Sequence, residues 1–252
     1  MIASKNDNDD IDVKIENIKN IPNHIAIICD GNRRWAKQNG KLLNLGHKAG
    51  ADNIENLCKY CIKYGVKYLT LYCLSIENLN RSETELEFLF RCFNSYLSQK
   101  NLDKAKQEGI DIKIIGNDEV LPKDLVQTIN NVNGQKLDKN NTKLHLSLCI
   151  GYSGRDEIIN LAKNISYEVK NNNLNIEDVN EEICEKYLYS KVIPNVDLMI
   201  RTGGDIRISN FLLWKISYAE LYFCQKYFPD FDEQEFLLAL YSFNSRIRRY
   251  GR

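Results

Sequence analysis

Residues 24–40, HIAIICDGNRRWAKQNG, join an apolar run to a group of charged side chains. The run Ile25–Cys29 is short, continuous in hydrophobicity and rich in β-branched residues, which is typical of a strand that is covered on both faces. It ends at Asp30, and after Gly31 and Asn32 come two arginines, Arg33 and Arg34. A buried strand that delivers one carboxylate and two guanidinium groups to its end indicates a ligand site at that end.

The rest of the chain repeats this pattern, because short apolar runs alternate with longer stretches of helical period. Such alternation predicts a parallel sheet with right-handed crossovers. With no internal repeat or linker, we predict one α/β domain over residues 21–252, after a loose N-terminal segment, residues 1–20. Its central sheet should be mostly parallel, with about six strands flanked by helices. The expected strands are Ile25–Cys29, Tyr68–Leu74, Ile110–Ile115, Leu144–Ile150, Asp197–Arg201 and Ala219–Phe223. The expected helices are His47–Tyr64, Ser82–Gln107, Arg155–Lys170 and Asp232–Arg249.

Local signals mark the ends of two of these helices. Gly65 directly follows the first one and is a good helix stop. The second opens with SETE, in which Ser82 can cap the helix and Glu85 can bond back to it. This arrangement is a capping box, so we expect the helix to begin there.

The composition limits the possible partners. Lys and Arg total 34 and Asp and Glu total 34, so the net charge is zero and no bulk attraction for nucleic acid is expected. Among the eight cysteines, Cys58 and Cys61 form the only close pair, and they fall in a helical apolar pattern that predicts buried thiols. The N-terminal residues lack a secretory pattern, and no apolar stretch is long enough to cross a bilayer. We therefore expect a protein without a transmembrane segment that could still lie against a membrane.

Three of the predicted strands end in chemically active residues, and ligands gather at the carboxyl ends of parallel strands. Acids there can hold Mg²⁺, arginines can bind a phosphate bidentately, and glycines let backbone N–H groups approach an anion. The chain lacks the phosphate-binding loop Gly-x-x-x-x-Gly-Lys and a dinucleotide fingerprint, and its three histidines do not suggest a triad or a zinc site. The residues thus indicate a Mg²⁺-assisted enzyme that acts on a phosphate or diphosphate. The three strand ends are DGNRR at 30–34, SIENLNR at 75–81 and RTGGDIRIS at 201–209.

Other interpretations remain open on the residues alone. The acids and arginines could simply pair with each other at the strand ends. A Mg²⁺-dependent phosphatase could use Asp30 as its nucleophile, although such folds usually place a second Asp two residues later, where this chain has Asn32. The terminal cluster SRIRRYGR, residues 245–252, could be a solvated tail or a local anion site.

Five blocks taken together resemble the cis-prenyltransferases, the family that includes undecaprenyl diphosphate synthase and dehydrodolichyl diphosphate synthase. They are HIAIICDGNRRWAKQNG, GHKAG, LTLYCLSIENLNR, GYSGRDEI and DLMIRTGGDIRISNFLLWKISYAELYF, and they occur in this order along most of the chain. The resemblance implies an enzyme that adds isopentenyl diphosphate units to an allylic diphosphate such as farnesyl diphosphate, with Mg²⁺ as cofactor. It also implies a cis double bond in each new unit, a hydrophobic tunnel and a long polyprenyl or dolichol-type product.

The resemblance assigns a role to each matching residue. Asp30 would be the catalytic aspartate that manages Mg²⁺ on the leaving diphosphate, and Glu220 would be the second carboxylate near the metal. Fixed donors and a metal aimed at the leaving group lower the barrier to ionisation. Asn78 would assist proton removal. The allylic diphosphate would lie against Gly31, Asn32, Arg33, Arg34, Trp35 and His47; the loop between the substrates would present Ser75, Glu77 and Arg81; and isopentenyl diphosphate would contact Arg201, Arg207, Ser209, Arg249 and Gly251.

The chain departs from the family pattern at several positions. Arg33 stands where bacterial members have Gly and many eukaryotic members have Arg. Leu79 replaces a Trp that is typical of bacterial members. Leu43 occupies the place of a further diphosphate-binding Arg, so we expect that contact to be absent or replaced by Arg33. Ile206 occupies the place of a His near the metal, which argues against a third metal ligand.

The resemblance also bears on partners and product length. The terminal RRYG is similar to the Arg-x-Gly tail that reaches a neighbouring subunit's site in the family, so we expect a homodimer. Without a visible transmembrane segment or signal peptide, we expect it in the cytoplasm or on the cytosolic face of the endoplasmic reticulum. The alternative is a non-catalytic subunit of a heteromeric enzyme, but such relatives tend to lose the acid and arginines that this chain keeps at 30–34. An apolar stripe fits one wall of a tunnel and fits ordinary core equally well. The stripe comprises Leu86, Leu89, Phe90, Phe93 and Leu97.

Overall fold

A computed structural model describes residues 18–135 and 139–246 of the chain. Within these residues the strands form one parallel sheet in the order β3-β4-β2-β1-β5-β6. All the expected strands are confirmed, with small differences at their ends, because most of them are apolar runs that the sheet buries. The strands are β1 (His24–Ile28), β2 (Tyr68–Ser75), β3 (Ile110–Ile115), β4 (Leu144–Tyr152), β5 (Leu198–Arg201) and β6 (Glu220–Phe223).

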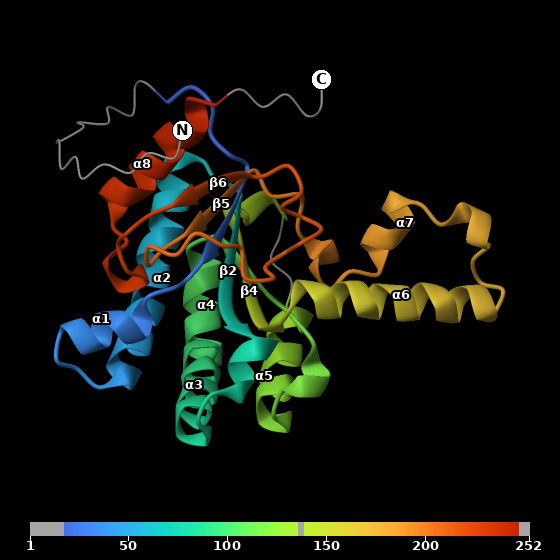
Figure 1. The fold of residues 1–252 in the computed structure, drawn as a ribbon, viewed down its shortest axis with the longest axis horizontal. Coiled ribbons are helices and arrows are strands. Elements are labelled where there is room, and N and C mark those ends of the chain that lie inside the picture. Colours follow the sequence, from blue (N-terminus) through green and yellow to red (C-terminus); the bar gives the residue numbers. More distant parts are fainter. Residues whose placement is uncertain (1–17, 136–138, 247–252) are drawn as a thin grey trace.

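Helices pack on the sheet in an arrangement that follows from the alternation of side chains along each strand (Figure 1). In β1, Ile25 and Ile27 join the larger apolar layer, which α2, α3, α4, α5 and α8 cover. Ala26 and Ile28 point to the other face, where they join a second apolar cluster with residues from the segments 193–196 and 211–216. The helices are α1 (Asn32–Gln38), α2 (Leu43–Tyr64), α3 (Glu83–Tyr96), α4 (Gln99–Gln107), α5 (Lys123–Gly134), α6 (Gly154–Lys170), α7 (Glu181–Lys186) and α8 (Glu233–Asn244).

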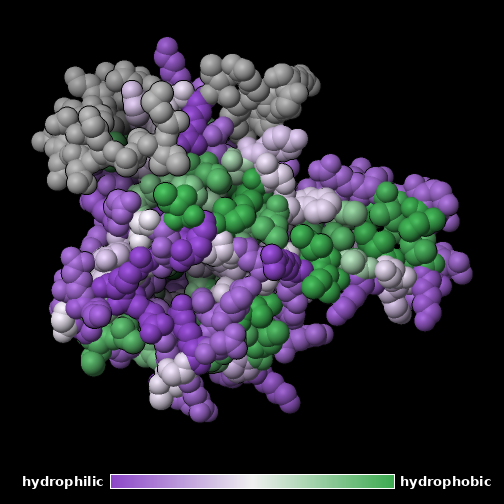
Figure 2. All heavy atoms as spheres, viewed as in Figure 1, coloured by the Kyte–Doolittle hydropathy of each residue, from purple (hydrophilic) through white to green (hydrophobic). Residues whose placement is uncertain are grey.

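The helices α6 and α7 project from the body as an arm (Figure 1). A small apolar cluster that includes Leu161 and Leu188 holds the arm together. Figure 2 shows that apolar side chains also reach the surface of the arm. Ile159 is 54% exposed and Ile176 is 61% exposed, so this part of the chain presents apolar area to its surroundings.

One expected helix is two helices in the structure. The stretch Ser82–Gln107 breaks after Tyr96, because Ser98 takes an extended conformation and begins α4. The capping box at its start is also wrong: Ser82 stands at the N-cap but makes no capping hydrogen bond. Its partner Glu85 turns instead toward basic side chains of the site described below.

Several other helix boundaries differ from expectation. The helix α2 begins at Leu43 rather than His47, and α8 ends at Asn244 rather than Arg249. Sequence patterns did not indicate α1, α5 or α7, since α1 and α7 are too short for a clear period. Cys58 and Cys61 are buried in α2 as predicted. Among the described residues, no helix is both long and apolar enough to cross a membrane.

Candidate active site

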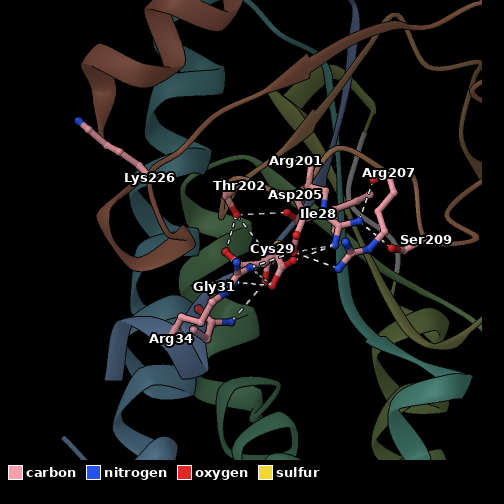
Figure 3. A network of polar contacts seen from close by, with 12 residues as sticks. Ile28, Cys29, Gly31, Arg34, Arg201, Thr202, Asp205, Arg207, Ser209 and Lys226 are labelled. Carbon is pink, nitrogen blue, oxygen red and sulfur yellow. Dashed lines mark hydrogen bonds and ion pairs between the residues drawn. The ribbon is translucent and has the colours of Figure 1, made fainter. Parts of the chain in front are cut away.

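The carboxyl ends of β1 and β5 lie side by side, with Ile28 paired to Arg201 (Figure 3). Asp30 follows the end of β1 and contacts Arg201 there. Its carboxylate accepts hydrogen bonds from Arg201 Nη2 at 2.8 Å and from the Gly31 backbone N–H at 2.6 Å, and Arg34 Nη2 lies 3.1 Å away. Thr202 Oγ1 fixes the backbone of Asp30 too, because it accepts from the N–H at 3.0 Å and donates to the carbonyl oxygen at 2.7 Å. The structure therefore holds this carboxylate in one orientation between two guanidinium groups.

Asp205 is a site residue that sequence reasoning missed, because a single acid within RTGGDIRIS has no distinguishing spacing. Its Oδ2 accepts from Arg34 Nη2 at 3.2 Å and from Arg207 Nη2 at 3.0 Å, and lies 3.7 Å from Arg201 Nη2. Slight burial acts to raise the pKa of Asp205, but the hydrogen bond from Arg207 and the three positive charges outweigh it and hold the pKa below its ordinary value. Three arginines from two strand ends thus share one carboxylate, as Figure 3 shows.

Arg201 organises the loop that follows β5. It is only 3% exposed, and its Nη1 donates to the Arg207 carbonyl oxygen at 2.7 Å and to Ser209 Oγ at 2.6 Å. Its Nε is buried without a hydrogen-bond partner. The Arg207 side chain, in contrast, is 59% exposed, so it can reach a ligand from the open side of the site.

The two glycines of GHKAG let α2 approach the first residue of α1. A Cβ at Gly46 would lie 2.1 Å from the backbone oxygen of Asn32, and a Cβ at Gly50 would lie 2.4 Å from its Oδ1. Gly31 has a φ of +106°, which favours glycine, and a Cβ there would meet the Tyr227 ring at 2.6 Å. Glycine at these positions is therefore what lets the DGNRR turn close against its neighbours.

Basic side chains from three elements gather around Glu85 of α3. His47 Nε2 lies 3.0 Å from Glu85 Oε1, Arg81 Nη1 lies 3.2 Å from the same oxygen, and Arg33 Nη1 lies 3.9 Å from the other one. Burial lowers the pKa of His47, and the hydrogen bond to Glu85 offsets this only in part. The imidazole is therefore neutral near pH 7 and can donate one hydrogen bond and accept another.

Ser75 and Asn78 form a reciprocal pair at the carboxyl end of β2. The Asn78 backbone N–H donates to Ser75 Oγ at 3.1 Å, and the Ser75 N–H donates to Asn78 Oδ1 at 3.4 Å. This is a capping box, at a different place from the one that the sequence indicated. Glu77, between them in sequence, directs its carboxylate to Asn210 Nδ2 at 2.8 Å.

These strand ends enclose a polar cavity of about 540 Å³. Trp35 and Glu77 are not among the residues that line it, and Trp35 Nε1 donates instead to Asp230 Oδ1 at 2.7 Å. Asp205 lines the cavity although it was not predicted. The expected site residues that line it are Asp30, Gly31, Asn32, Arg33, Arg34, His47, Ser75, Asn78, Arg81, Arg201, Arg207 and Ser209.

A second cavity of about 540 Å³ adjoins the first, and its walls are largely apolar. Cys29, Asn32 and Cys73 line both cavities, so a ligand could extend from one into the other. Burial raises the pKa of Cys73 to about 12, so its thiol is neutral there. Only part of the apolar stripe predicted at 86–97 reaches this cavity. Leu89, Phe93 and Leu97 line the cavity, whereas Leu86 and Phe90 do not.

The structure does not bring Glu220 to this cluster. Parallel pairing sets Glu220 beside Leu198 at the amino end of β5. Glu220 therefore lies at the amino ends of the strands, whereas Asp30 lies at their carboxyl ends. Its carboxylate accepts a hydrogen bond from Arg246 Nη1 at 2.8 Å. Asp30 and Glu220 therefore do not face one metal ion within a single chain. The tail residues Arg249 and Gly251 lie outside the described residues.

The donor chemistry of the polar cavity fits Mg²⁺ only in company with a phosphate. Among the described residues, no three His, Cys, Asp or Glu side chains are placed to hold a metal ion by themselves. Mg²⁺ usually takes one or two carboxylates together with phosphate oxygens and water. Asp30 and Asp205 can supply carboxylate oxygens and the arginines can bind a diphosphate, so these residues suit a Mg²⁺ ion that arrives with its diphosphate.

Comparison with known proteins gives consistent matches. The family described as "Putative undecaprenyl diphosphate synthase" matches residues 28–251. The geranylgeranyl-diphosphate-specific tritrans,polycis-undecaprenyl-diphosphate synthase of Thermoplasma acidophilum is 41% identical, over 95% of this chain and 93% of its own. A (2Z,6Z)-farnesyl diphosphate synthase of Solanum lycopersicum is 40% identical, over 94% of this chain and 83% of its own.

A solved structure agrees with these sequence matches. Lavandulyl diphosphate synthase from Lavandula x intermedia, in complex with dimethylallyl diphosphate, superposes with a TM-score of 0.86 at 36% identity, over 92% of this chain and 99% of its own. Sequence and fold therefore agree along nearly the whole chain. The chain belongs to the undecaprenyl diphosphate synthase family and is a cis-prenyltransferase.

Proposed function

We propose that this cis-prenyltransferase condenses isopentenyl diphosphate with an allylic diphosphate in the polar cavity and accommodates the growing chain in the apolar one. The observation that carries the proposal is the junction of the two cavities, where Asp30 and several arginines stand beside an apolar space. A diphosphate fits the first environment and a prenyl chain fits the second. A phosphatase acting on small monoesters would have no use for the apolar cavity.

Two groups of residues divide the diphosphates between them in this proposal. Arg33, Arg34 and His47, with the backbone at Gly31 and Asn32, hold the allylic diphosphate, because they come from α1 and the start of α2 on one side of the cavity. Arg201, Arg207 and Ser209 come from the β5 end and hold isopentenyl diphosphate. Asp30 stands between the two groups. When bound, Mg²⁺ supplies positive charge against the leaving diphosphate.

The remaining residues serve proton transfer and orientation. Asn78 faces the cavity, and its capping pair with Ser75 holds its amide where it can assist removal of a proton from the new unit. Arg81 donates to Glu85 and keeps its charge near the allylic side. Trp35 packs beside the cradle through its bond to Asp230.

The primer and the product length are further parts of the proposal. Farnesyl diphosphate is the primer that the resemblance favours, but the Thermoplasma acidophilum relative is named for geranylgeranyl diphosphate and the lavandulyl diphosphate synthase was solved with dimethylallyl diphosphate. We propose that the chain extends a farnesyl primer to a long polyprenyl diphosphate of the dolichol-precursor type. Incubation with each of the three primers and labelled isopentenyl diphosphate, followed by chain-length analysis, compares them directly.

Assembly and location complete the proposal. We propose that residues 21–252 form the catalytic domain and that two copies make a homodimer, which the exposed apolar side chains of the arm support. The dimer would act in the cytoplasm or at the cytosolic face of the endoplasmic reticulum, with peripheral contact to the membrane. In this arrangement the tail residues Arg249 and Gly251 would complete a neighbouring site. Light scattering of the purified chain measures its mass in solution.

The substitution Asp30→Ala tests the catalytic assignment. We expect turnover to fall by roughly two or more orders of magnitude, because an electrostatic contribution to the departure of the diphosphate is lost. The melting temperature should stay close to that of the wild type. The matched control is Asp103→Ala, an exposed acid of α4 that lines neither cavity, which should keep full turnover. Retention of most turnover by Asp30→Ala would contradict the mechanism.

A further inference from the structure

The loop after β5 contains a strained segment next to the site. Three residues other than glycine have positive φ angles there: Ser209 at 46°, Asn210 at 62° and Leu212 at 43°. Such conformations persist only where the surrounding structure holds them, and they cluster at functional sites. Leu212 is fully buried, so packing accounts for its conformation. The conformations of Ser209 and Asn210 need another explanation.

Asn210 is held by four hydrogen bonds. Its backbone oxygen accepts from the Gly154 N–H at 2.8 Å and its Oδ1 accepts from the Arg155 N–H at 3.0 Å, which satisfies two free N–H groups at the start of α6. Its Nδ2 donates to Ser153 Oγ at 2.6 Å and to Glu77 Oε1 at 2.8 Å. Both ends of the amide are therefore used, and asparagine is also one of the few residues that tolerate this backbone region.

The hydrogen bonds of Asn210 connect two walls of the polar cavity, although neither Asn210 nor Glu77 lines the cavity itself. Glu77 belongs to the turn at 75–80, whose Ser75 and Asn78 line one side of the cavity. Asn210 directly follows Ser209, which lines the other side and accepts a hydrogen bond from Arg201. Burial of Glu77 acts to raise its pKa, but the hydrogen bonds that it accepts, the one from Asn210 first among them, keep the pKa below its ordinary value. The bond from Asn210 is therefore charge-assisted.

We propose that Asn210 is a positioning residue that sets the isopentenyl diphosphate side of the cavity, and that Glu77 acts through it rather than on a substrate. Asn210 holds Ser209 in its left-handed conformation, Ser209 and the Arg207 carbonyl hold the Arg201 guanidinium, and Arg201 holds Asp30. The Glu77 bond ties this series to the turn that carries Asn78. The inference rests on the proposed assignment of Arg207 and Ser209 to isopentenyl diphosphate.

The substitution Asn210→Gly tests the proposal, because glycine keeps the left-handed backbone without strain and removes only the side-chain bonds. We expect the KM for isopentenyl diphosphate to rise about tenfold, the loss that follows when a charge-assisted bond is removed. The KM for the allylic primer should change by less than about twofold. Asn210→Ala should be worse than Asn210→Gly, since it adds backbone strain.

One control and two further variants separate positioning from simple stability. Asn172→Ala introduces the same backbone strain, at a φ of 58°, in an exposed turn after α6, and should leave both KM values unchanged. Glu77→Ala should reproduce the rise in the KM for isopentenyl diphosphate. The double variant Glu77→Ala with Asn210→Gly should be no worse than Asn210→Gly alone, because Asn210→Gly already removes the bond to Glu77.

Each outcome decides the matter. Unchanged KM for isopentenyl diphosphate in a folded, active Asn210→Gly protein would mean that Asn210 only caps α6, and would leave the proposed function intact. Equal rises in both KM values, or additive effects in the double variant, would also overturn the positioning role. If Asn210→Gly does not fold, Glu77→Ala alone must raise the KM for isopentenyl diphosphate selectively for the proposal to stand. Absence of prenyl transfer by the wild-type protein would instead contradict the proposed function.

Discussion

The contact between α1 and α2 offers a sharp test of the allylic site, because two glycines of α2, Gly46 and Gly50, pack against Asn32. Alanine at Gly46 would place its Cβ 2.1 Å from the backbone oxygen of Asn32, an atom that cannot move without moving α1. Alanine at Gly50 would place its Cβ 2.4 Å from the Asn32 Oδ1, the end of a side chain that can rotate. The same chemical change should therefore have two different consequences.

The magnitudes follow from the two obstacles. Overpacking typically costs about 1–3 kcal/mol, and alanine recovers about 1 kcal/mol of helix propensity relative to glycine. We expect the overpacking cost of Gly46→Ala to lie at the upper end of this range. The free energy of unfolding should then fall by about 2 kcal/mol net, and the melting temperature should be roughly 4–8 °C lower. Gly50→Ala should keep its stability within about 1 kcal/mol, but should rotate Asn32 away from the cradle. Its KM for the allylic primer should rise about tenfold.

The assay combines thermal unfolding with steady-state kinetics at saturating isopentenyl diphosphate. Gly134→Ala at the end of α5 is the matched control, since nothing lies within 4 Å of a Cβ there. It should unfold at or slightly above the wild-type temperature and keep wild-type KM values. The reasoning fails if Gly46→Ala is as stable as Gly134→Ala. An unchanged allylic KM in Gly50→Ala would show that Asn32 does not serve the allylic diphosphate.

Three further predictions concern charge. Asp205→Asn removes the carboxylate that competes for three arginines, so inorganic pyrophosphate should bind on the order of tenfold more tightly in calorimetry; weaker binding would show that Asp205 is needed to position them. Arg34→Ala should mainly raise the KM for the allylic diphosphate and Arg207→Ala mainly that for isopentenyl diphosphate, each by about tenfold or more; equal effects on both substrates would contradict the division of the site. Burial lowers the pKa of His24 to about 4, so the unfolded chain binds this proton more readily than the folded chain does. The contribution of His24 to the free energy of unfolding is therefore fully present above about pH 6.5, and it should fall by on the order of 3 kcal/mol as the pH drops toward 4. Denaturant titrations should show this slope flattened in His24→Leu, and an unchanged slope would exclude His24 as its source.

The strands could be predicted from the sequence because their signal is local. A strand covered on both faces is a continuous apolar run, as β1 is. The edge strand Ile110–Ile115, in which apolar and charged residues alternate, also occurs with the limits that were expected. Helix limits were less secure. The apolar period of Ser82–Gln107 continues through the break after Tyr96, since a turn of the backbone does not interrupt the spacing of apolar residues. Asp30, Arg34 and Arg201 could likewise be singled out, because each one follows or ends an apolar run.

Only the tertiary structure decided which of these residues meet. Arg201 contacts Asp30 across 171 residues because β5 pairs with β1 in the sheet, and no local pattern contains that neighbour relation. The same pairing draws Asp205 into the site although nothing in its sequence context marked it. Glu220 shows the converse. It belongs to the same long sequence motif as Arg201 and Arg207. A strand, however, carries its first and last residues to opposite ends, and Glu220 begins β6 whereas Asp30 follows the end of β1.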